Sequence, residues 1–131
     1  MVKFNKKEIG FLQENEACRI ATLHNNVPHI TPVTYYFENG FLYFATDYDT
    51  RKYKNLQKNN RIAIVVDIYK AGGNKAVIIQ GTTEFIEKGP EFKRLYRIFY
   101  RKFSWVKEMP WKEGEAPFIK IIPKTKTSWG L

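Results

Sequence analysis

Cysteine and histidine are scarce in this sequence of 131 residues, which contains one cysteine, Cys18, and two histidines, His24 and His29. Neither a paired CxxC nor an HExxH motif occurs, which argues against the common zinc sites, and we expect no metal site. Cys18 has no partner for an internal disulfide and lies among apolar residues. This context predicts a small buried hydrophobic side chain rather than a reactive thiol.

Glycine-rich motifs that bind nucleotides are also missing. The sequence has neither a Walker loop nor the Rossmann glycine fingerprint, and Gly72-Gly73 is an ordinary turn signal. Its acidic residues are scattered, with no pair that suggests acid–base work. The sequence therefore leaves the catalytic residues unknown, and an enzyme with so few titratable candidates would take its chemistry from a cofactor.

No apolar run reaches the length that spans a membrane, and the first residues, Met1 to Glu8, contain no apolar signal core. Together with the single cysteine, these absences predict a cytoplasmic protein without a membrane segment. Hydrophobic residues make up 44% of the chain and charged residues 27%, which is typical of a globular protein. A chain of this length is expected to form one domain, residues 1–131.

Positive charge and aromatic rings are plentiful instead. Lysine and arginine total 22 against 13 acidic residues, a net charge of +9, and aromatic residues reach 16%. The charge indicates an anionic partner, which could be a nucleic acid, an acidic lipid or a phosphorylated small molecule. Flat rings beside cations could stack nucleobases or clamp a planar cofactor, so composition leaves both interpretations open.

Apolar patterns predict six strands, several of them joined by hairpin turns such as Asn25-Asn26. The predicted strands are 17–24, 29–37, 41–46, 61–69, 76–87 and 117–122, followed by a short tail at 123–131. Pro32 should interrupt the second strand, because proline cannot donate to a strand ladder, and Gly81 should bend the fifth. The pattern predicts a mainly β (α+β) fold, an antiparallel barrel with flanking helices.

Two of the three predicted helices have clear signals of their own. Asn5 can cap a helix over 5–14, with Glu8 as its box partner. A later helix opens at Gly89-Pro90 and has a buried stripe at helical spacing. The stripe is Phe92, Leu95, Tyr96, Phe99, Phe103 and Val106, and the opposite basic face is Lys93, Arg94, Arg97, Arg101 and Lys102. We interpret the basic face as solvated surface.

The remaining helix, over 50–58, begins in an unusual way. Asp49 or Thr50 can cap it, and Arg51 and Lys52 fall in its first turn, where acids are the usual choice. Two cations beside free backbone N–H groups make a concentrated anion site. The segment suggests a phosphate site, but a solvated basic helix start in a lysine-rich protein would have the same sequence.

The order of these segments resembles the pyridoxamine 5′-phosphate oxidase-like family, which consists of FMN-binding split barrels. The resemblance runs from about Glu8 to Trp129 and rests on a series of motifs at matching spacings. The series is Arg19-Ile20-Ala21-Thr22-Leu23, Pro28-His29-Ile30-Thr31-Pro32-Val33, Gly40-Phe41-Leu42-Tyr43-Phe44-Ala45-Thr46, Thr50-Arg51-Lys52-Tyr53-Lys54-Asn55-Leu56, Asn60-Arg61-Ile62-Ala63-Ile64, Val77-Ile78-Ile79-Gln80-Gly81-Thr82-Thr83-Glu84 and Lys126-Thr127-Ser128-Trp129. It implies a six-stranded antiparallel split β-barrel with flanking helices.

The resemblance also implies a homodimer with two flavin sites at its interface. It places the FMN phosphate against Arg51 and Lys52, with Asn55 one turn further on. The second strand would run beside the isoalloxazine ring, and the break at Pro32 would free backbone groups to hydrogen-bond the ring. The residues of that strand are His29, Ile30, Thr31, Val33 and Thr34.

Three further positions match residues that approach the cofactor in the family. Thr46 and Gln80 match positions that often line the cofactor, and Trp129 matches a tail position that can reach the site from the other subunit. Each has an ordinary alternative, since Gln80 could face solvent and Trp129 could pack the C-terminus down. Thr31 and Thr34 are good strand residues in any case.

The function that the resemblance implies is a flavin-binding (FMN) oxidoreductase with a small-molecule substrate. Some members of the family use a deazaflavin cofactor with a polyglutamate tail, which the net charge of +9 would suit. Longer members carry substrate-binding arginine and histidine residues in a C-terminal region, and we do not predict pyridoxal phosphate synthesis for a sequence that ends at Leu131. Two alternatives stay open: a flavin store or sensor without turnover, and a non-catalytic nucleic-acid-binding barrel. Many aromatic residues fall on core positions, so nucleic acid is the weaker prediction.

Overall fold

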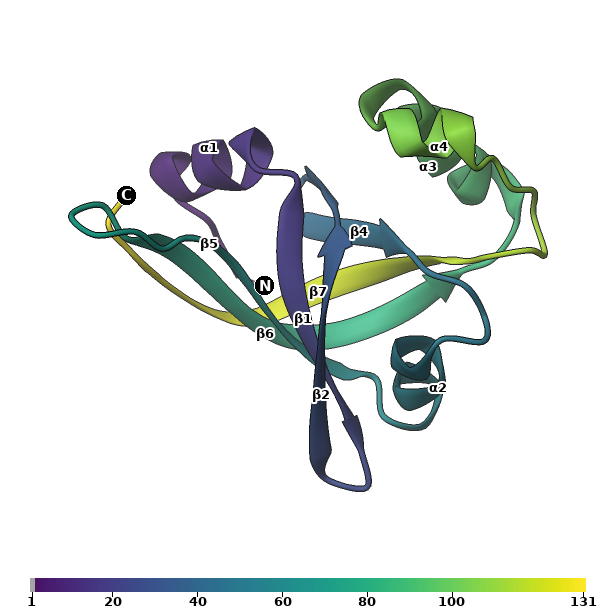
Figure 1. Cartoon of the computed structure of the whole chain (residues 1–131), viewed down its shortest axis with the longest axis horizontal. Coiled ribbons are helices and arrows are strands. Elements are labelled where there is room, and N and C mark those ends of the chain that lie inside the picture. Colours follow the sequence, from purple (N-terminus) through teal and green to yellow (C-terminus); the bar gives the residue numbers. More distant parts are fainter. Residues whose placement is uncertain (1) are drawn as a thin grey trace.

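The computed structural model of the chain describes residues 2–131 and contains seven strands and four helices (Figure 1). The elements in chain order are α1 (Lys6–Glu14), β1 (Ala17–His24), β2 (Val27–Thr34), β3 (Tyr36–Glu38), β4 (Phe41–Ala45), α2 (Arg51–Lys58), β5 (Arg61–Ile68), β6 (Lys75–Ile86), α3 (Gly89–Lys102), α4 (Ser104–Glu108) and β7 (Phe118–Trp129). All strand pairs are antiparallel, and the strands form one sheet in the order β2-β1-β5-β6-β7-β4-β3. The predicted class, mainly β with flanking helices, is confirmed.

The second predicted strand is in fact two strands, so the prediction of six strands was wrong by one. The break lies at Tyr35 and not at Pro32. Tyr35 is buried, its N–H donates to the carbonyl of Glu16 over 2.8 Å, and its hydroxyl donates to the carbonyl of Leu12 over 2.6 Å. Pairing with β1 continues through Pro32, which lies opposite Arg19. Because β2 is an outermost strand, a missing N–H on its open side costs no ladder bond.

The break at Tyr35 explains how the sheet curls. β2 and β3 are the two edge strands of the sheet, yet only Tyr35 separates them in the chain. The two edges must therefore approach each other at this residue. The sheet wraps into a half-barrel, and no ladder joins β2 to β3 within residues 2–131 (Figure 1).

β7 extends further than the sequence predicted. The expected tail at 123–131 continues the strand as far as Trp129 and pairs with β6. Pro123 lies opposite Gly81, where the register of the β6–β7 pair shifts. A Cβ at Gly81 would lie 2.1 Å from the carbonyl oxygen of Ile122, so the close crossing requires glycine. This bulge is the bend expected at Gly81, and a proline is tolerated opposite it.

Two apolar cores hold the elements together. The larger core fills the concave side of the sheet and includes Leu12 of α1 with Cys18, Ile20 and Phe44. Cys18 is 0% exposed, which confirms that it is a buried residue. None of the helices within residues 2–131 has the length and apolar character needed to cross a membrane.

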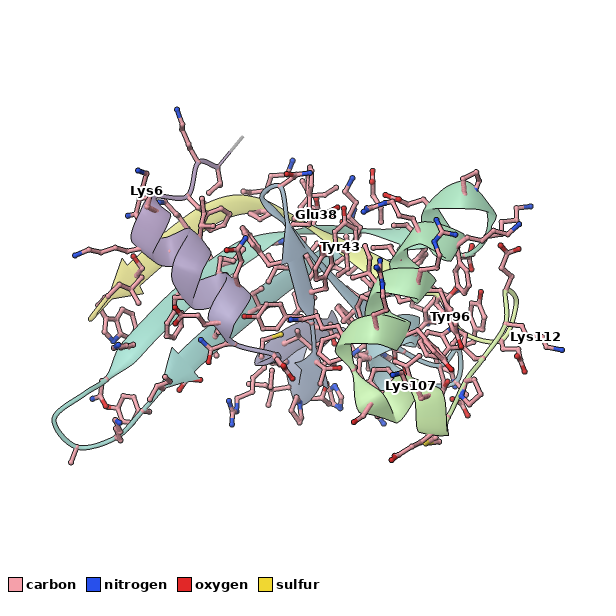
Figure 2. The ribbon with its side chains drawn as sticks, turned by 90° about the horizontal axis from the view of Figure 1, so that it is seen from above. Lys6, Glu38, Tyr43, Tyr96, Lys107 and Lys112 are labelled. Atoms are coloured by element: carbon pink, nitrogen blue, oxygen red, sulfur yellow. The ribbon has the colours of Figure 1, made fainter. Side chains whose placement is uncertain are left out.

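The second core lies between the sheet and a helical lobe, which consists of α3, α4 and the loop 109–117 (Figure 1). The predicted stripe is buried, but it spans two helices and not one, because α3 ends at Lys102 and α4 begins at Ser104. Phe92, Leu95, Phe99, Phe103 and Val106 are buried, Tyr96 is half-buried, and the stripe packs against Tyr43 and Phe118 of the sheet. Figure 2 shows Tyr96 within this lobe and Lys112 pointing away from it.

Candidate functional site

The start of α2 combines a well-formed cap with positive charge. Thr50 is the N-cap, and its side chain accepts a hydrogen bond from a first-turn N–H. Thr46, which is 7% exposed, places its hydroxyl oxygen 2.9 Å from that of Thr50. The first turn of α2 has no acidic side chain. The helix dipole and the cations Arg51 and Lys52 therefore make this end of α2 positive.

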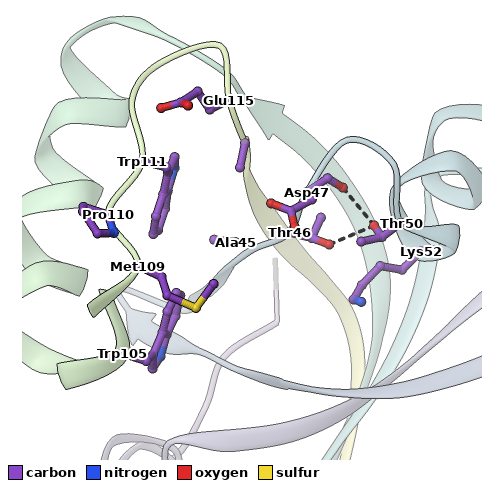
Figure 3. A pocket seen from close by; sticks show the side chains of 11 residues that line it. Ala45, Thr46, Asp47, Thr50, Lys52, Trp105, Met109, Pro110, Trp111 and Glu115 are labelled. Atoms are coloured by element: carbon purple, nitrogen blue, oxygen red, sulfur yellow. Dashed lines mark hydrogen bonds between the residues drawn. The ribbon is translucent and has the colours of Figure 1, made fainter. Parts of the chain in front are cut away.

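A pocket of about 640 Å³ separates the start of α2 from the helical lobe (Figure 3). Its lining residues are Ala45, Thr46, Asp47, Thr50, Lys52, Trp105, Met109, Pro110, Trp111, Glu115 and Ala116. Figure 3 shows the two tryptophans on one side and Thr46, Thr50 and Lys52 on the other. We call this space the tryptophan pocket. One wall is aromatic and the other is polar, and its volume suits a small organic molecule.

A second pocket, of about 400 Å³, lies on the other side of the start of α2. It is lined by His24, Asp49, Arg51, Lys54, Asn55 and Lys58, and we call it the basic pocket. Three cations face one carboxylate in this lining, so the pocket favours an anionic ligand.

Arg51 and Lys52 were expected to hold one phosphate together, but their side chains line different pockets. Arg51 is exposed and lines the basic pocket, whereas Lys52 is half-buried and lines the tryptophan pocket. Consecutive side chains on an α-helix point about 100° apart, so neighbours in the sequence diverge. An anion at the N-terminus of α2, where the first N–H groups have no carbonyl partner within the helix, could be reached by one cation from each side.

The inner face of β2 carries two buried polar atoms with no partner among the described residues, Nδ1 of His29 and Oγ1 of Thr31. In the β1–β2 ladder, His29 lies opposite Thr22 and Thr31 lies opposite Ile20. Thr22 is 1% exposed and accepts a hydrogen bond from Asn55 of α2 over 3.0 Å. Opposite residues share a face of the sheet, so His29 and Thr31 lie on the side that α2 covers. Buried polar atoms are normally hydrogen-bonded, which indicates a missing partner at this face.

The other predicted site residues are not gathered at the start of α2. Ile30 points to the opposite face of β2 and is 66% exposed, while Val33 packs against the larger core. Thr34 is half-buried at the end of the strand. Gln80 is exposed on β6 and accepts a hydrogen bond from a threonine of β7 over 3.1 Å. Trp129 ends β7 at the far end of the sheet from α2, so in a single chain neither Gln80 nor Trp129 lines the two pockets (Figure 1).

Three titratable groups near α2 and β1 have raised pKa values and do not ionise readily. Burial, reinforced by the neighbouring carboxylate of Glu87, raises the pKa of Tyr48 to about 12 and also raises the pKa of Tyr53. Burial likewise raises the pKa of the Cys18 thiol to about 12. All three groups stay protonated at neutral pH. Over residues 2–131, no cluster of three or more His, Cys, Asp or Glu side chains could hold a metal ion.

Sequence reasoning gave no role to Trp105, Met109 or Trp111, which form the aromatic wall of the tryptophan pocket. Their signal in the sequence is two tryptophans close to Pro110, outside the regular stripe of the lobe. The Nε1 atoms of both tryptophans are buried with no partner among the described residues.

Comparison with known proteins identifies the family. The pyridoxamine 5′-phosphate oxidase family model matches residues 5–127. The chain belongs to this family. The matched residues include the start of α2 and both pockets, so the site described above lies within the family domain.

One similar protein has a described activity. The chain is 33% identical to the 5a,11a-dehydrotetracycline/5a,11a-dehydrooxytetracycline reductase of Streptomyces rimosus subsp. rimosus, over 98% of this chain and 84% of the reductase.

Two solved structures show how widely the family fold is shared. A FAD-binding protein from Mesorhizobium loti has a TM-score of 0.77 and 20% identity, over 95% of this chain and 94% of that chain. A heme storage protein from Vibrio cholerae has a TM-score of 0.79 and 11% identity, over 98% of this chain and 95% of that chain. At these identities the likeness shows the fold alone.

Proposed function

We propose that this member of the pyridoxamine 5′-phosphate oxidase family is a flavin-dependent oxidoreductase that binds FMN and acts on a small organic molecule. The observation that carries the proposal is the pair of unpartnered buried atoms on β2, Nδ1 of His29 and Oγ1 of Thr31. A planar ring with nitrogen and oxygen atoms at its edge would supply partners for both.

The residues at the start of α2 fit the phosphate of the same cofactor. Arg51 and Lys52 would approach it from two sides, and the first N–H groups of α2 would donate to it. Asn55 would act through Thr22, to which it donates, by fixing α2 against β1. When bound, the flavin ring would carry out the hydride and electron transfer, and the chain would bind the ring, orient it and exclude water.

The proposal includes a homodimer with the cofactor at its interface. β2 is an edge strand that exposes Val27 and Ile30, which are 62% and 66% exposed, and a second copy would cover them. In such a dimer, Trp129 of the partner subunit could approach a site that Trp129 does not reach within its own chain. A cytoplasmic location remains part of the proposal.

The identity to a dehydrotetracycline reductase supports a reduction of a small organic acceptor. A deazaflavin with an acidic tail is the second candidate cofactor, and the basic pocket favours it, because Arg51, Lys54 and Lys58 could pair with carboxylates. Nucleic acid is disfavoured, because most of the aromatic rings that could stack bases are packed within the two cores.

The test is anaerobic reduction of the FMN-loaded protein. We expect a reduced nicotinamide or a reduced deazaflavin to bleach the long-wavelength flavin band in a single turnover, and an added organic acceptor to restore it. Dithionite serves as the control that the bound flavin can be reduced. If dithionite bleaches the band and neither physiological donor does, the protein is a flavin store or sensor, and the proposed turnover is wrong.

A further inference from the structure

We propose that the tryptophan pocket is the substrate site and that it selects planar, conjugated fused-ring molecules that carry carbonyl or hydroxyl oxygens. Naming this ligand the substrate rests on the proposed flavin chemistry, whereas its binding depends on the pocket alone. Three features of the pocket support this ligand class: the shape of its aromatic wall, its unpartnered donors and its balance of charge.

The aromatic wall is flat and wide. The rings of Trp105 and Trp111 are parallel within 4°, with centroids 5.9 Å apart. Figure 3 shows both rings nearly edge-on, one above the other, with their faces toward Ala45 and Thr46. Two parallel indoles make a flat surface wider than one ring, which a fused-ring molecule can contact as a whole. A puckered saturated molecule of the same size would meet it at fewer atoms.

The wall is also held in place before any ligand arrives. Trp111 packs edge-on against Tyr96, with centroids 4.9 Å apart at 77°, and against Phe118 at 5.6 Å. Its backbone N–H donates to the hydroxyl of Tyr96 over 3.3 Å. Trp105 lies against Phe103, with centroids 6.3 Å apart at 28°. A wall fixed in this way loses little side-chain freedom on binding.

The unpartnered indole donors favour an oxygen at the rim of the wall, because an indole N–H lies in the plane of its ring and does not point out from its face. Nε1 of Trp105 and Nε1 of Trp111 are both buried, and neither has a partner among the described residues. An indole N–H can only donate, so its partner must be an acceptor. Carbonyl and hydroxyl oxygens at the edge of a conjugated ring system are acceptors that a hydrocarbon ring lacks.

The charge of the lining favours a weakly charged ligand. Lys52 stands opposite the tryptophan wall, while Asp47 and Glu115 bring negative charge to the same lining. The carboxylate of Glu115 already accepts a hydrogen bond from the N–H of Lys112 over 2.7 Å. One cation against two carboxylates does not resemble a site for a multiply charged phosphorylated substrate.

The experiment is isothermal titration calorimetry of the full chain with the dihydroxyanthraquinone alizarin, a planar fused-ring probe with four oxygens. We expect one saturable site. Trp105→Leu should weaken binding by about tenfold or more, and Trp105→Phe, which keeps a ring but loses the donor, by about threefold to tenfold. Tyr69→Leu, at a 78% exposed aromatic residue outside the pocket lining, is the control and should leave the affinity unchanged.

Two further titrations keep the outcomes distinct. Decahydronaphthalene-1,4-dione, which has oxygens but no flat ring system, should bind at least about tenfold more weakly than alizarin. Saturation with FMN should leave alizarin binding intact. Equal binding of the saturated dione, unchanged binding in Trp105→Leu, no saturable binding, or displacement by FMN would each overturn the inference. If alizarin binds as expected but the protein does not bind FMN, the proposed flavin function is wrong and the inference about the pocket stands.

Discussion

At the scale of single residues, Thr22 and Thr31 form a matched pair on neighbouring strands. The hydroxyl oxygen of Thr22 accepts from Asn55 over 3.0 Å, whereas that of Thr31 is buried with no partner among the described residues. An unsatisfied buried hydroxyl costs about 1–3 kcal/mol. Thr31→Val should therefore raise the free energy of unfolding of the cofactor-free protein, and Thr22→Val should lower it, because Asn55 loses its acceptor. Urea denaturation measures both.

In the Thr31 variant, the affinity for FMN should fall although the free energy of unfolding rises. If Oγ1 of Thr31 contacts the cofactor, Thr31→Val binds FMN about tenfold more weakly although it is the more stable protein. A ligand-free Thr31→Val protein that is destabilised as much as Thr22→Val would show that the hydroxyl already has a partner, and the interpretation of this atom would fail.

The residue scale also shows where prediction from the sequence stopped. The first-turn cations of α2 could be located from the chain alone, because a cap and a helix start are local. Helix geometry makes the two side chains point in different directions. Which pocket each side chain lines depends on the elements that pack on either side of α2. Trp105 and Trp111 could not be assigned, because only the tertiary fold brings α4 and the loop after it opposite Lys52.

At the scale of elements, Glu8 both caps α1 and links this helix to β7. The predicted capping box is present, with the N–H of Glu8 donating to the side chain of Asn5 over 2.8 Å and the N–H of Asn5 donating to the Glu8 carboxylate over 2.9 Å. The same carboxylate accepts from the hydroxyl of Ser128 over 2.7 Å and pairs with the ammonium group of Lys126. Glu8 therefore fastens α1 to β7.

This arrangement predicts a pH dependence. Burial would raise the pKa of Glu8, but hydrogen bonds from Lys126, Asn5 and Ser128 outweigh it and hold the pKa below the ordinary 4.5. A carboxyl group with a lowered folded-state pKa contributes stability fully above its unfolded pKa and loses it as pH falls through the folded pKa. The free energy of unfolding should thus fall as the pH drops below about 4.5, and Glu8→Gln should lose more stability at neutral pH than at pH about 3.

Urea denaturation at the two pH values checks this expectation. Glu14→Gln, at an exposed position of the same helix, is the matched control for a general carboxylate effect. An equal loss at both pH values in Glu8→Gln would mean that the charge of Glu8 does not hold α1 to β7.

Most elements could be predicted because their signals are local, and two of the errors involve prolines. β1 has the predicted bounds, 17–24, and α1 and α2 differ from prediction by only the cap residue. Pro32 was expected to interrupt its strand, and the sixth strand was expected to end just before Pro123. Pro32 lies on an edge strand, and Pro123 lies opposite the bulge at Gly81. What lies opposite a proline depends on distant strand pairing, which the local pattern does not contain.

At the scale of the whole molecule, the open edge at β2 predicts association. We expect sedimentation velocity to show a dimer of twice the 15.5 kDa chain mass. Ile30→Glu places a charge on the exposed face of β2, where Ile30 is 66% exposed, and should shift the protein toward monomer. Tyr100→Glu, at a 42% exposed residue of α3, should not. A wild-type monomer at concentrations that bind FMN would refute the proposed interface site.

The central claim is that the basic start of α2 holds the phosphate of a flavin cofactor, and that the same cofactor hydrogen-bonds the unpartnered buried atoms of β2. The most direct test is equilibrium titration of the cofactor-free protein with FMN and, separately, with riboflavin, which lacks the phosphate. We expect FMN to bind about tenfold to a hundredfold more tightly than riboflavin. The double variant Arg51→Ala/Lys52→Ala should lower the affinity for FMN to that for riboflavin. Lys7→Ala, at an exposed lysine of α1, should leave the affinity for FMN unchanged. Equal affinity for FMN and riboflavin, or binding of neither, would contradict the account.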